Sequence, residues 1–335
     1  MKVLFHCNLP FGLAHGGQQI QIERTMAALQ MIGIEVEPLH WWDSRQTGDI
    51  IHYCSRISAD QIRLARQKGF KVVMAELLTG QGSRSTSQLW LQRNINRFLK
   101  QAAPRQFIAA FNWESYQLAD AIIANTPWEA YLMTYLFAAP QPNLYTVPNG
   151  VEDIFLNSSP VPRSPWLVCT ATITERKRVL ELAQAAVFAQ TPVWIIGKAY
   201  AENDPYAQQF FSLAKQHSQI IRYEGAISDR VRLAKIYREA HGFVLLSTME
   251  TRSLSAEEAA ACECPLLLSD LPWARSTFGE YARYCPIDSV RQTAVHLKDF
   301  YQQAPTLKPP LKPLTWLEVA GQLKNIYERL LSTSR

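Results

Sequence analysis

The stretch from Ser247 to Asp270 constrains the fold of this chain more than any other. An apolar run, Gly242 to Leu246, precedes it and has the length and flanks of a buried strand. A polar loop containing Glu250 follows, then a helix start, then a second apolar run from Pro265 to Leu268. This order predicts a βαβ unit, and the loop at the carboxyl end of its first strand is where open α/β sheets bind ligands.

Two glutamates, Glu250 and Glu258, lie eight residues apart in this stretch. A loop after a buried strand has no structural need for a carboxylate, so Glu250 is a functional candidate. Glu258 is predicted in the first turn of the helix, three residues after Ser255, and this spacing predicts a capping box at the helix start. Glu258 therefore has a structural interpretation as well as a functional one.

The length of 335 residues predicts two domains of about 150 residues each. A hydrophobic content of 47% and a charged content of 19% are typical of a soluble globular protein. No apolar run approaches the roughly 18 residues that span a bilayer.

The N-terminal run is too short for a signal peptide and predicts a first buried strand. Six cysteines without a C-x-x-C spacing indicate reduced core thiols in the cytosol rather than disulfides or metal ligands.

The formal net charge of +5 is mild. It favours anionic ligands such as sugar nucleotides, or a weak attraction to an anionic membrane face. A nucleic-acid partner is not expected, because the chain has no Lys/Arg tract, no zinc spacing and no aromatic-basic motif.

The first half of the chain alternates short strands with helices, which predicts a parallel, doubly wound sheet. Strands are expected at 2–7, 34–39, 49–53, 70–75 and 118–125, and helices at 18–31, 59–68 and 127–137. Gly16 and Gly17 directly precede the first helix, where glycines let a backbone approach an anionic ligand. A plain tight turn is the alternative interpretation. The pattern is not G-x-G-x-x-G, which argues against a dinucleotide dehydrogenase.

An amphipathic helix is predicted over 85–101, with Leu89, Trp90, Phe98 and Leu99 on one side. The basic residues Arg93, Arg97 and Lys100 are expected on the other side. One interpretation is an interfacial helix on anionic lipid. The other, which we favour, is an ordinary domain helix with a solvated basic face.

The second half repeats the alternation, with strands at 166–171, 192–197 and 220–223 and helices at 178–189, 207–216 and 229–240. The Pro/Ser-rich segment 158–165 lies near the expected domain junction. The stiff linker 308–313 precedes a final amphipathic helix over 316–331. The predicted architecture is α/β, with domains at 1–155 and 156–312 and a C-terminal segment, 313–335, that packs back toward the first domain.

Several stretches, in this order and spacing, resemble the family 4 retaining glycosyltransferases of the GT-B fold. The matching pieces are Gly16-Gly17, LADAIIANTPWEA at 118–130, VPNGVE at 147–152, ITERKRVLELAQA at 173–185, the Glu250 loop, and the closing helix TWLEVAGQLKNIYERLL. The resemblance implies two Rossmann-like domains that face each other across a cleft. It implies an acceptor side in the N-terminal domain and a donor side in the C-terminal domain.

The resemblance also implies roles for individual residues. Lys177 matches a lysine that contacts the donor diphosphate, and Glu250 an acidic residue placed against the donor sugar. Glu258 matches the residue that binds the ribose hydroxyls. The backbone of Thr251, Arg252, Ser253 and Leu254 lies where the family's loop and helix N-terminus cradle phosphate, and Gly16 and Gly17 are included in the donor-binding set. No metal and no cofactor are implied, because lysine and helix dipoles neutralise the diphosphate.

The chain also departs from the family pattern. Thr172 stands where an arginine is common five residues before the lysine, and Arg176 and Arg178 are the candidate substitutes. Thr251-Arg252-Ser253 replaces Gly-Phe-Gly, and Glu263 replaces a glycine at the helix C-terminus, where a left-handed conformation is expected. Glu76 stands where a histidine is often found, with His15 as a speculative stand-in.

The resulting hypothesis is a cytoplasmic retaining hexosyltransferase that moves a sugar from a nucleotide-diphosphate sugar to a glycan or lipid-linked acceptor, as in polysaccharide biosynthesis. The alternative is a catalytically inactive GT-B relic that binds a sugar nucleotide or a glycan as a partner protein. A phosphorylase or a sugar-nucleotide epimerase on the same fold is a third interpretation. We expect peripheral contact with the inner membrane face to be weak at most.

Overall fold

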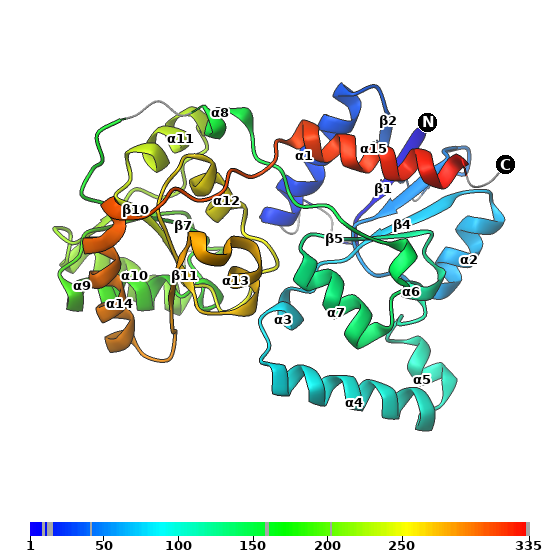
Figure 1. The fold of residues 1–335 in the computed structure, drawn as a ribbon, viewed down its shortest axis with the longest axis horizontal. Helices are drawn as coiled ribbons and strands as arrows, with labels where there is room; N and C mark the ends of the chain where they lie inside the picture. The colour runs from blue at the N-terminus through cyan, green and yellow to red at the C-terminus, as the bar shows by residue number, and fades with distance from the viewer. Residues whose placement is uncertain (9–10, 12–15, 41, 158–160, 202, 333–335) are drawn as a thin grey trace. The chain divides into compact units, whose positions relative to one another are not determined.

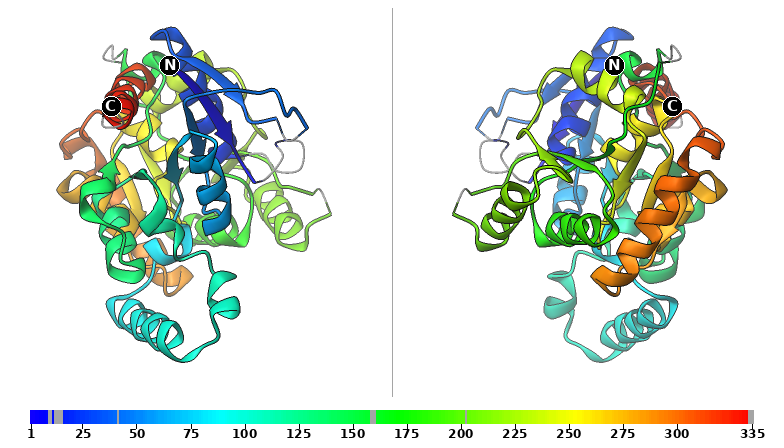
Figure 2. Two further views of the ribbon diagram at one scale, coloured as in Figure 1. Left: turned by 90° about the vertical axis from the view of Figure 1, so that its right-hand side faces the viewer. Right: turned by 90° about the vertical axis from the view of Figure 1, so that its left-hand side faces the viewer.

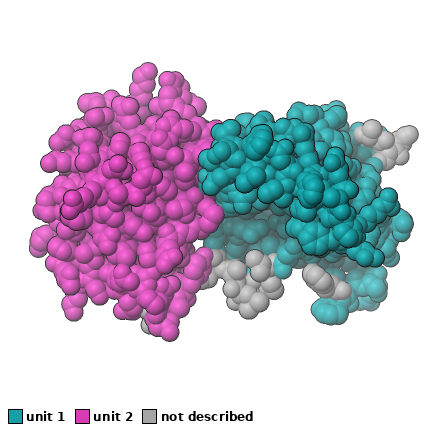
Figure 3. Space-filling view, turned by 90° about the horizontal axis from the view of Figure 1, so that it is seen from below, with its two compact units in different colours: residues 1–150, 314–335 teal, residues 151–313 magenta. Residues whose placement is uncertain are grey.

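The computed structural model describes the whole chain except residues 9–10, 12–15, 41, 158–160, 202 and 333–335. The chain divides into two compact units, coloured separately in Figure 3. Unit 1 comprises Met1–Gly150 and Leu314–Arg335, and unit 2 comprises Val151–Pro313. Unit 2 is therefore an insertion in the chain of unit 1. Among the described helices, none combines the length and the apolar character that crossing a bilayer requires.

Unit 1 is built on a parallel sheet of six strands in the order β2-β1-β3-β4-β5-β6. The strands are β1 (Lys2–His6), β2 (Glu35–Pro38), β3 (Ile50–Tyr53), β4 (Lys71–Ala75), β5 (Ala121–Ala124) and β6 (Leu144–Thr146). The central strands are buried along almost their whole length, because helices cover both faces of the sheet. Such runs of Val, Ile, Leu and Ala are what a doubly wound sheet requires.

The helices of unit 1 lie on the two faces of this sheet (Figure 1). They are α1 (Gly17–Met31), α2 (Ala59–Gln67), α3 (Thr79–Gly82), α4 (Thr86–Ala102), α5 (Arg105–Ala109), α6 (Ser115–Leu118), α7 (Pro127–Phe137) and α15 (Trp316–Ser332). The C-terminal helix α15 packs on α1, and its Tyr327 hydroxyl lies 2.6 Å from His52 Nδ1 on β3. Burial lowers the pKa of His52 to about 3, so this imidazole is neutral in the folded chain.

The two chain segments of unit 1 meet at Gly150 and Trp316. A Cβ atom on Gly150 would lie 2.6 Å from the backbone nitrogen of Trp316, closer than folded proteins allow. Gly150 therefore lets the chain leave unit 1 directly beside the point where it returns. Gly150 belongs to the VPNGVE stretch at 147–152, and it supplies the residue without a side chain that this close approach needs.

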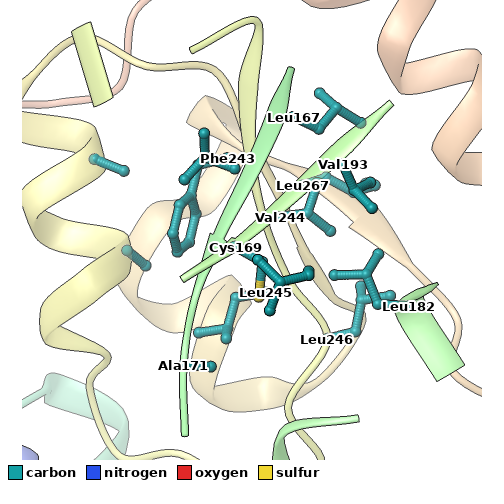
Figure 4. Packing of buried hydrophobic residues seen from close by; sticks show 14 of the residues in the cluster. Leu167, Cys169, Ala171, Leu182, Val193, Phe243, Val244, Leu245, Leu246 and Leu267 are labelled. Carbon is teal, nitrogen blue, oxygen red and sulfur yellow. The ribbon is translucent and has the colours of Figure 1, made fainter. Parts of the chain in front are cut away.

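Unit 2 also contains six parallel strands, in the order β12-β11-β10-β7-β8-β9. The strands are β7 (Leu167–Thr170), β8 (Val193–Ile196), β9 (Ile221–Tyr223), β10 (Gly242–Leu245), β11 (Leu266–Ser269) and β12 (Arg283–Cys285). Their buried side chains form one continuous core, part of which Figure 4 shows around Phe243, Val244 and Leu267. All six cysteines of the chain are free thiols, and five of them are buried.

The helices of unit 2 cover both faces of its sheet (Figure 2). They are α8 (Asp153–Leu156), α9 (Val179–Ala189), α10 (Pro205–Gln216), α11 (Arg230–Glu239), α12 (Leu254–Ala261), α13 (Pro272–Phe278) and α14 (Val290–Gln303). Helices α9, α10 and α14 pack together, and α8, α11 and α12 form a second group. The expected fold class, α/β with two doubly wound Rossmann-like sheets, is confirmed.

Gly197, directly after β8, lies in close contact with the backbone directly after β7. Its φ is +154°, and a Cβ atom would lie 1.8 Å from the carbonyl oxygen of Ala171. We expect Gly197→Ala to lower the free energy of unfolding by at least ~3 kcal/mol, because backbone must move to admit the methyl group. Gly225→Ala is the matched control: it has a φ of +80° and open space around the new Cβ, so only the left-handed strain of about 1–2 kcal/mol applies. Equal unfolding midpoints in urea for the two variants would contradict this account.

Glu129, on α7, is a buried carboxyl group that accepts two backbone hydrogen bonds. The N–H of Leu78 donates to it at 2.6 Å and the N–H of Asn125 at 2.7 Å. Burial nevertheless raises its pKa from 4.5 to about 7. The folded chain therefore holds a proton between these two pH values that the unfolded chain has lost.

The contribution of Glu129 to stability should fall as the pH rises from about 5 to 8, by up to about 3 kcal/mol. Glu129→Gln keeps the shape and one acceptor oxygen but cannot titrate. We expect the free energy of unfolding of the wild type, measured in urea, to lose more between pH 5 and 8 than that of the variant. Parallel pH profiles for the two proteins would show that Glu129 is not the titrating group.

Candidate functional site

The candidate site of unit 2 lies where the strand order reverses. From β7 the chain builds outward through β8 and β9, then returns to place β10 on the other side of β7 and continues to β11 and β12. Strands β7 and β10 are parallel neighbours, so the loops at their carboxyl ends share one edge of the sheet. Such a switch point is the usual ligand-binding position of an open α/β sheet.

The sequence candidates Lys177 and Glu250 come from these two loops. Lys177 ends the 3₁₀ turn η2 (Glu175–Lys177) after β7, and Glu250 follows β10. The Lys177 ammonium and Glu250 Oε1 form an ion pair, and both side chains are largely buried, with 12% and 11% of their surfaces exposed. Residues 73 positions apart in the chain are thus brought together as a charged pair in a low-dielectric position.

A third charge completes this group. Arg176 Nη1 lies 3.2 Å from Glu250 Oε1 and donates to the carbonyl oxygen of Met249 at 2.7 Å. The N–H of Thr248 donates to the carbonyl oxygen of Arg176 at 2.9 Å. The two loops are therefore joined through backbone as well as side chains, which fixes the position of Glu250. The group has two cations and one carboxylate, so it retains a positive charge that suits an anionic ligand.

Helix α12 begins two residues earlier than the predicted capping box requires. Ser253 is the N-cap, and its hydroxyl accepts a hydrogen bond from the N–H of Ala256. Ser255 lies inside the helix and Glu258 in its second turn, so the predicted Ser255–Glu258 capping box is wrong. The local reason is that Ser253 has the extended backbone of an N-cap residue (φ −84°, ψ 113°), which Ser255 does not.

The carboxylate of Glu258 instead pairs with Arg230 on α11. Arg230 also reaches Glu152 Oε1 at 3.0 Å and lies over the ring of Phe155, 4.7 Å from its centroid. Burial raises the pKa of Glu258, although Arg230 opposes the shift. Sequence reasoning missed Arg230, since it lies in an ordinary helix and no spacing relates it to Glu258.

Arg252 is held by Glu257, a fully buried carboxyl group one turn into α12. Burial raises the pKa of Glu257, and the Arg252 guanidinium opposes that shift. Thr251 is half-buried, and Leu254 is the first residue of α12. In the loop where the resembled family has two glycines, this chain thus has an arginine that forms an ion pair with a glutamate of α12. No spacing rule in the sequence predicts this pair.

The other departures from the family pattern also have defined environments. Of the two arginines considered as substitutes at Thr172, Arg176 contacts the Glu250 loop, while Arg178 lies 4.0 Å from Glu181. Glu263 has a φ of +57°, so the left-handed conformation expected there is confirmed without glycine. Glu76 forms an ion pair with Arg56 at 2.8 Å and accepts a hydrogen bond from the hydroxyl of Tyr116.

Gly16 and Gly17 belong to unit 1, whereas Lys177 and Glu250 belong to unit 2. Gly16 is the N-cap of α1 with a φ of +152°, and Gly17 is the first residue of that helix. The helix therefore begins one residue earlier than expected, and only Gly16 directly precedes it. His15 lies outside the residues that the structure describes. In the described part of the chain, no group of three His, Cys, Asp or Glu side chains is arranged to hold a metal ion.

The two six-stranded sheets and their connections define the GT-B fold, which solved glycosyltransferases share. One similar structure is sucrose-phosphate synthase from Thermosynechococcus elongatus, with a TM-score of 0.68 at 17% identity over 99% of both chains. HepE from Anabaena, solved in complex with UDP, has a TM-score of 0.67 at 13% identity, also over 99% of both chains.

The pneumococcal O-GlcNAc transferase GtfA, solved in complex with UDP and GlcNAc, has a TM-score of 0.61 at 17% identity. The match covers 84% of this chain but only 57% of GtfA, so the chain spans little more than half the length of that protein. The sequence matches no protein-family model and no curated protein. At these identities the structural comparisons identify the fold of the chain.

Proposed function

We propose that this chain is a retaining, metal-independent glycosyltransferase that uses a nucleotide-diphosphate sugar. The observation that carries the proposal is the buried Lys177–Glu250 ion pair, with Arg176 beside it, at the strand-order reversal of a GT-B unit. A sugar nucleotide presents two charges that such a group can meet: an anionic diphosphate and a sugar that becomes cationic as it leaves. We propose a cytoplasmic location and a glycan or lipid-linked acceptor.

In the proposed reaction the bond between the anomeric carbon and the diphosphate oxygen breaks, and a bond to the acceptor oxygen forms on the same face of the sugar. The acceptor proton passes to the departing phosphate oxygen, so no further base is needed. The Lys177 ammonium has three protons, and it can keep Glu250 as a partner while donating to the diphosphate. Glu250 stabilises the positive charge that develops on the sugar. The backbone of residues 251–254 is assigned to phosphate binding.

The inactive relic is the second candidate, and the Arg252–Glu257 pair is the observation that favours it. The Arg252 side chain, held by Glu257, leaves less room for a phosphate beside the loop than the glycines of the resembled family would. In that role the chain would bind a sugar nucleotide or a glycan as the partner of an active enzyme. It would bind donors and release no product.

The experiment that decides between these functions is a screen of UDP, GDP, ADP and TDP sugars with the purified chain. A sugar nucleotide that binds, present at 100 times its dissociation constant, should stabilise the folded chain by about 2.7 kcal/mol. A thermal-shift measurement detects a change of this size. Hits are then tested for release of nucleoside diphosphate, and the anomeric configuration of the product is read by NMR. Release with retention supports the transferase, and binding without release supports the relic. An absence of any nucleotide-dependent shift contradicts the transferase and leaves the relic only as a glycan-binding protein.

Glu258 is proposed to bind the ribose hydroxyls, and this role has a specific test. Glu258→Ala should weaken nucleoside diphosphate binding by about ten-fold or more, since a charge-assisted hydrogen bond contributes ~1.5–3 kcal/mol. Inorganic pyrophosphate lacks ribose, so its affinity should stay within about three-fold of the wild-type value. Isothermal titration with both ligands separates the two cases. A parallel loss for both ligands would mean that Glu258 acts on the fold through Arg230 rather than on ribose.

A further inference from the structure

Helix α4 in unit 1 turns apolar side chains outward. Its inner face packs on α7, where Leu89 is buried and Asn96 donates a hydrogen bond to the carbonyl oxygen of Leu136 at 3.2 Å. Arg93 lies over the ring of Tyr135, 4.3 Å from its centroid. The expected arrangement, with Trp90 and Phe98 inward and Arg93 in solvent, is therefore wrong. The helix has a polar asparagine in its buried face and apolar residues in its exposed one.

The exposed face of α4 continues onto α5 and the turn after it. Its members are large apolar side chains with 37–65% of their surfaces exposed: Trp90, Leu91, Ile95, Phe98, Phe107 and Phe111. We call this set the α4–α5 surface. Phe107 and Phe111 contact each other at a ring distance of 5.2 Å. In Figures 1 and 2, α4 and α5 lie at the border of unit 1, and α7 separates α4 from the sheet. An exposed apolar surface of this extent indicates an interaction site.

The part of the chain that carries the α4–α5 surface also has an excess of positive charge. Residues 77–113 contain five basic residues and no Asp or Glu: Arg84, Arg93, Arg97, Lys100 and Arg105. The whole chain has 34 basic and 29 acidic residues, so this segment accounts for its entire net charge of +5. Outside the segment the two signs balance. The excess positive charge of the protein is thus concentrated around its exposed apolar helix.

We propose that the α4–α5 surface docks on an anionic lipid bilayer. Apolar side chains would enter the boundary between head groups and acyl chains, and exposed basic side chains such as Arg97 and Arg105 would meet lipid phosphates. At 17 residues, α4 lies along the bilayer for about 25 Å. A second copy of the chain is a poor occupant, because a symmetric pair would face one set of basic residues with another. The inference is independent of the proposed catalysis and places the protein at a membrane.

The test is sedimentation of the full-length chain with lipid vesicles. Vesicles of phosphatidylcholine alone are compared with vesicles that contain about 30% phosphatidylglycerol. We expect binding to the anionic vesicles, much weaker binding to the neutral ones, and a loss of binding when salt is raised from about 0.05 to 0.5 M. The measurement needs no donor or acceptor, so its outcome is separate from that of the transferase assay.

Two pairs of variants separate the apolar and the charged contributions. The Ile95→Ser/Phe98→Ser variant should weaken binding at least about ten-fold, since binding scales with buried apolar area. The Arg97→Gln/Arg105→Gln variant should weaken it about 25-fold, at about five-fold per cation. The matched controls are Phe188→Ser/Val295→Ser and Lys215→Gln/Lys298→Gln, which change exposed residues of unit 2. The variants spare Leu89 and Asn96, and thermal unfolding checks that α4 stays folded.

Three results would overturn the proposal. One is the absence of binding to anionic vesicles at low salt. A second is an equal loss of binding in the unit 2 controls. The third is a stable dimer in light scattering that Ile95→Ser/Phe98→Ser disrupts, together with no vesicle binding, which would make the surface a protein interface.

Discussion

Glu250→Gln is expected to lower the rate of sugar transfer by about 10³-fold while the chain still folds and binds its donor. The amide keeps the shape of the carboxylate and can still accept a hydrogen bond from Lys177 or Arg176, but it removes the negative charge. Because that charge acts on a sugar that is cationic only in the transition state, kcat should fall far more than donor affinity. Initial rates at saturating donor and a donor titration measure the two quantities.

Glu175→Gln is the matched control for this variant. Glu175 begins η2, in the same loop as Lys177, but its side chain is exposed. The same loss of charge there should leave kcat within about three-fold of the wild-type value, as is usual for an exposed surface substitution. Full activity of Glu250→Gln would remove Glu250 from the mechanism.

Lys177→Met has the second large expected effect. The substitution removes the ammonium and keeps most of the aliphatic stem. Donor affinity should fall about 10–100-fold, as expected for the loss of a hydrogen bond to a charged group. The transfer rate should fall by a further 10²-fold or more, because the departing diphosphate loses charge stabilisation. Lys215→Met on α10 is the control for the change in side chain.

The ion pair makes the two variants interdependent. Glu250 retains Arg176 at 3.2 Å when Lys177 is removed, so the carboxylate is not left without a cation. The double variant Lys177→Met/Glu250→Gln should therefore lose less activity than the product of the two single losses. Strict additivity would argue that the residues act at separate places. Unchanged affinity for nucleoside diphosphate in Lys177→Met would exclude the diphosphate role of that lysine.

The periodic parts of the fold were predictable because local pattern and burial agree. Helix α7 matches the predicted range 127–137, and Thr126 caps it as its sequence position before proline suggests. The central strands of both sheets are short apolar runs, which buried parallel strands require. The Lys177–Glu250 pair was predictable only as two members of one family pattern. Their direct contact depends on the adjacency of β7 and β10, which no local signal contains.

The features that sequence reasoning missed are contacts between distant or offset residues. The start of α12 depended on which of two serines, Ser253 or Ser255, has the extended backbone. The Arg230–Glu258 pair joins two helices that are distant in sequence. The face of α4 that is buried is the one that packs on α7, a contact between two helices that are separate in sequence. On α4 the pattern predicted the right helix and the wrong inner face, because the spacing of apolar residues does not show which stripe of a helix a neighbouring element covers.

The close approach of Gly150 and Trp316 has a consequence for protein engineering. Since the chain leaves unit 1 beside the point of its return, unit 2 has the connectivity of a domain inserted into a host. Fusing Gly150 to Leu314 through a short glycine linker would yield a minimal host that retains β1 to β6 and α15. A circular permutant that begins at Val151 would carry the same two units in a different gene order. The close contact at Gly150 thus lets unit 1 and unit 2 be encoded and expressed as separate segments.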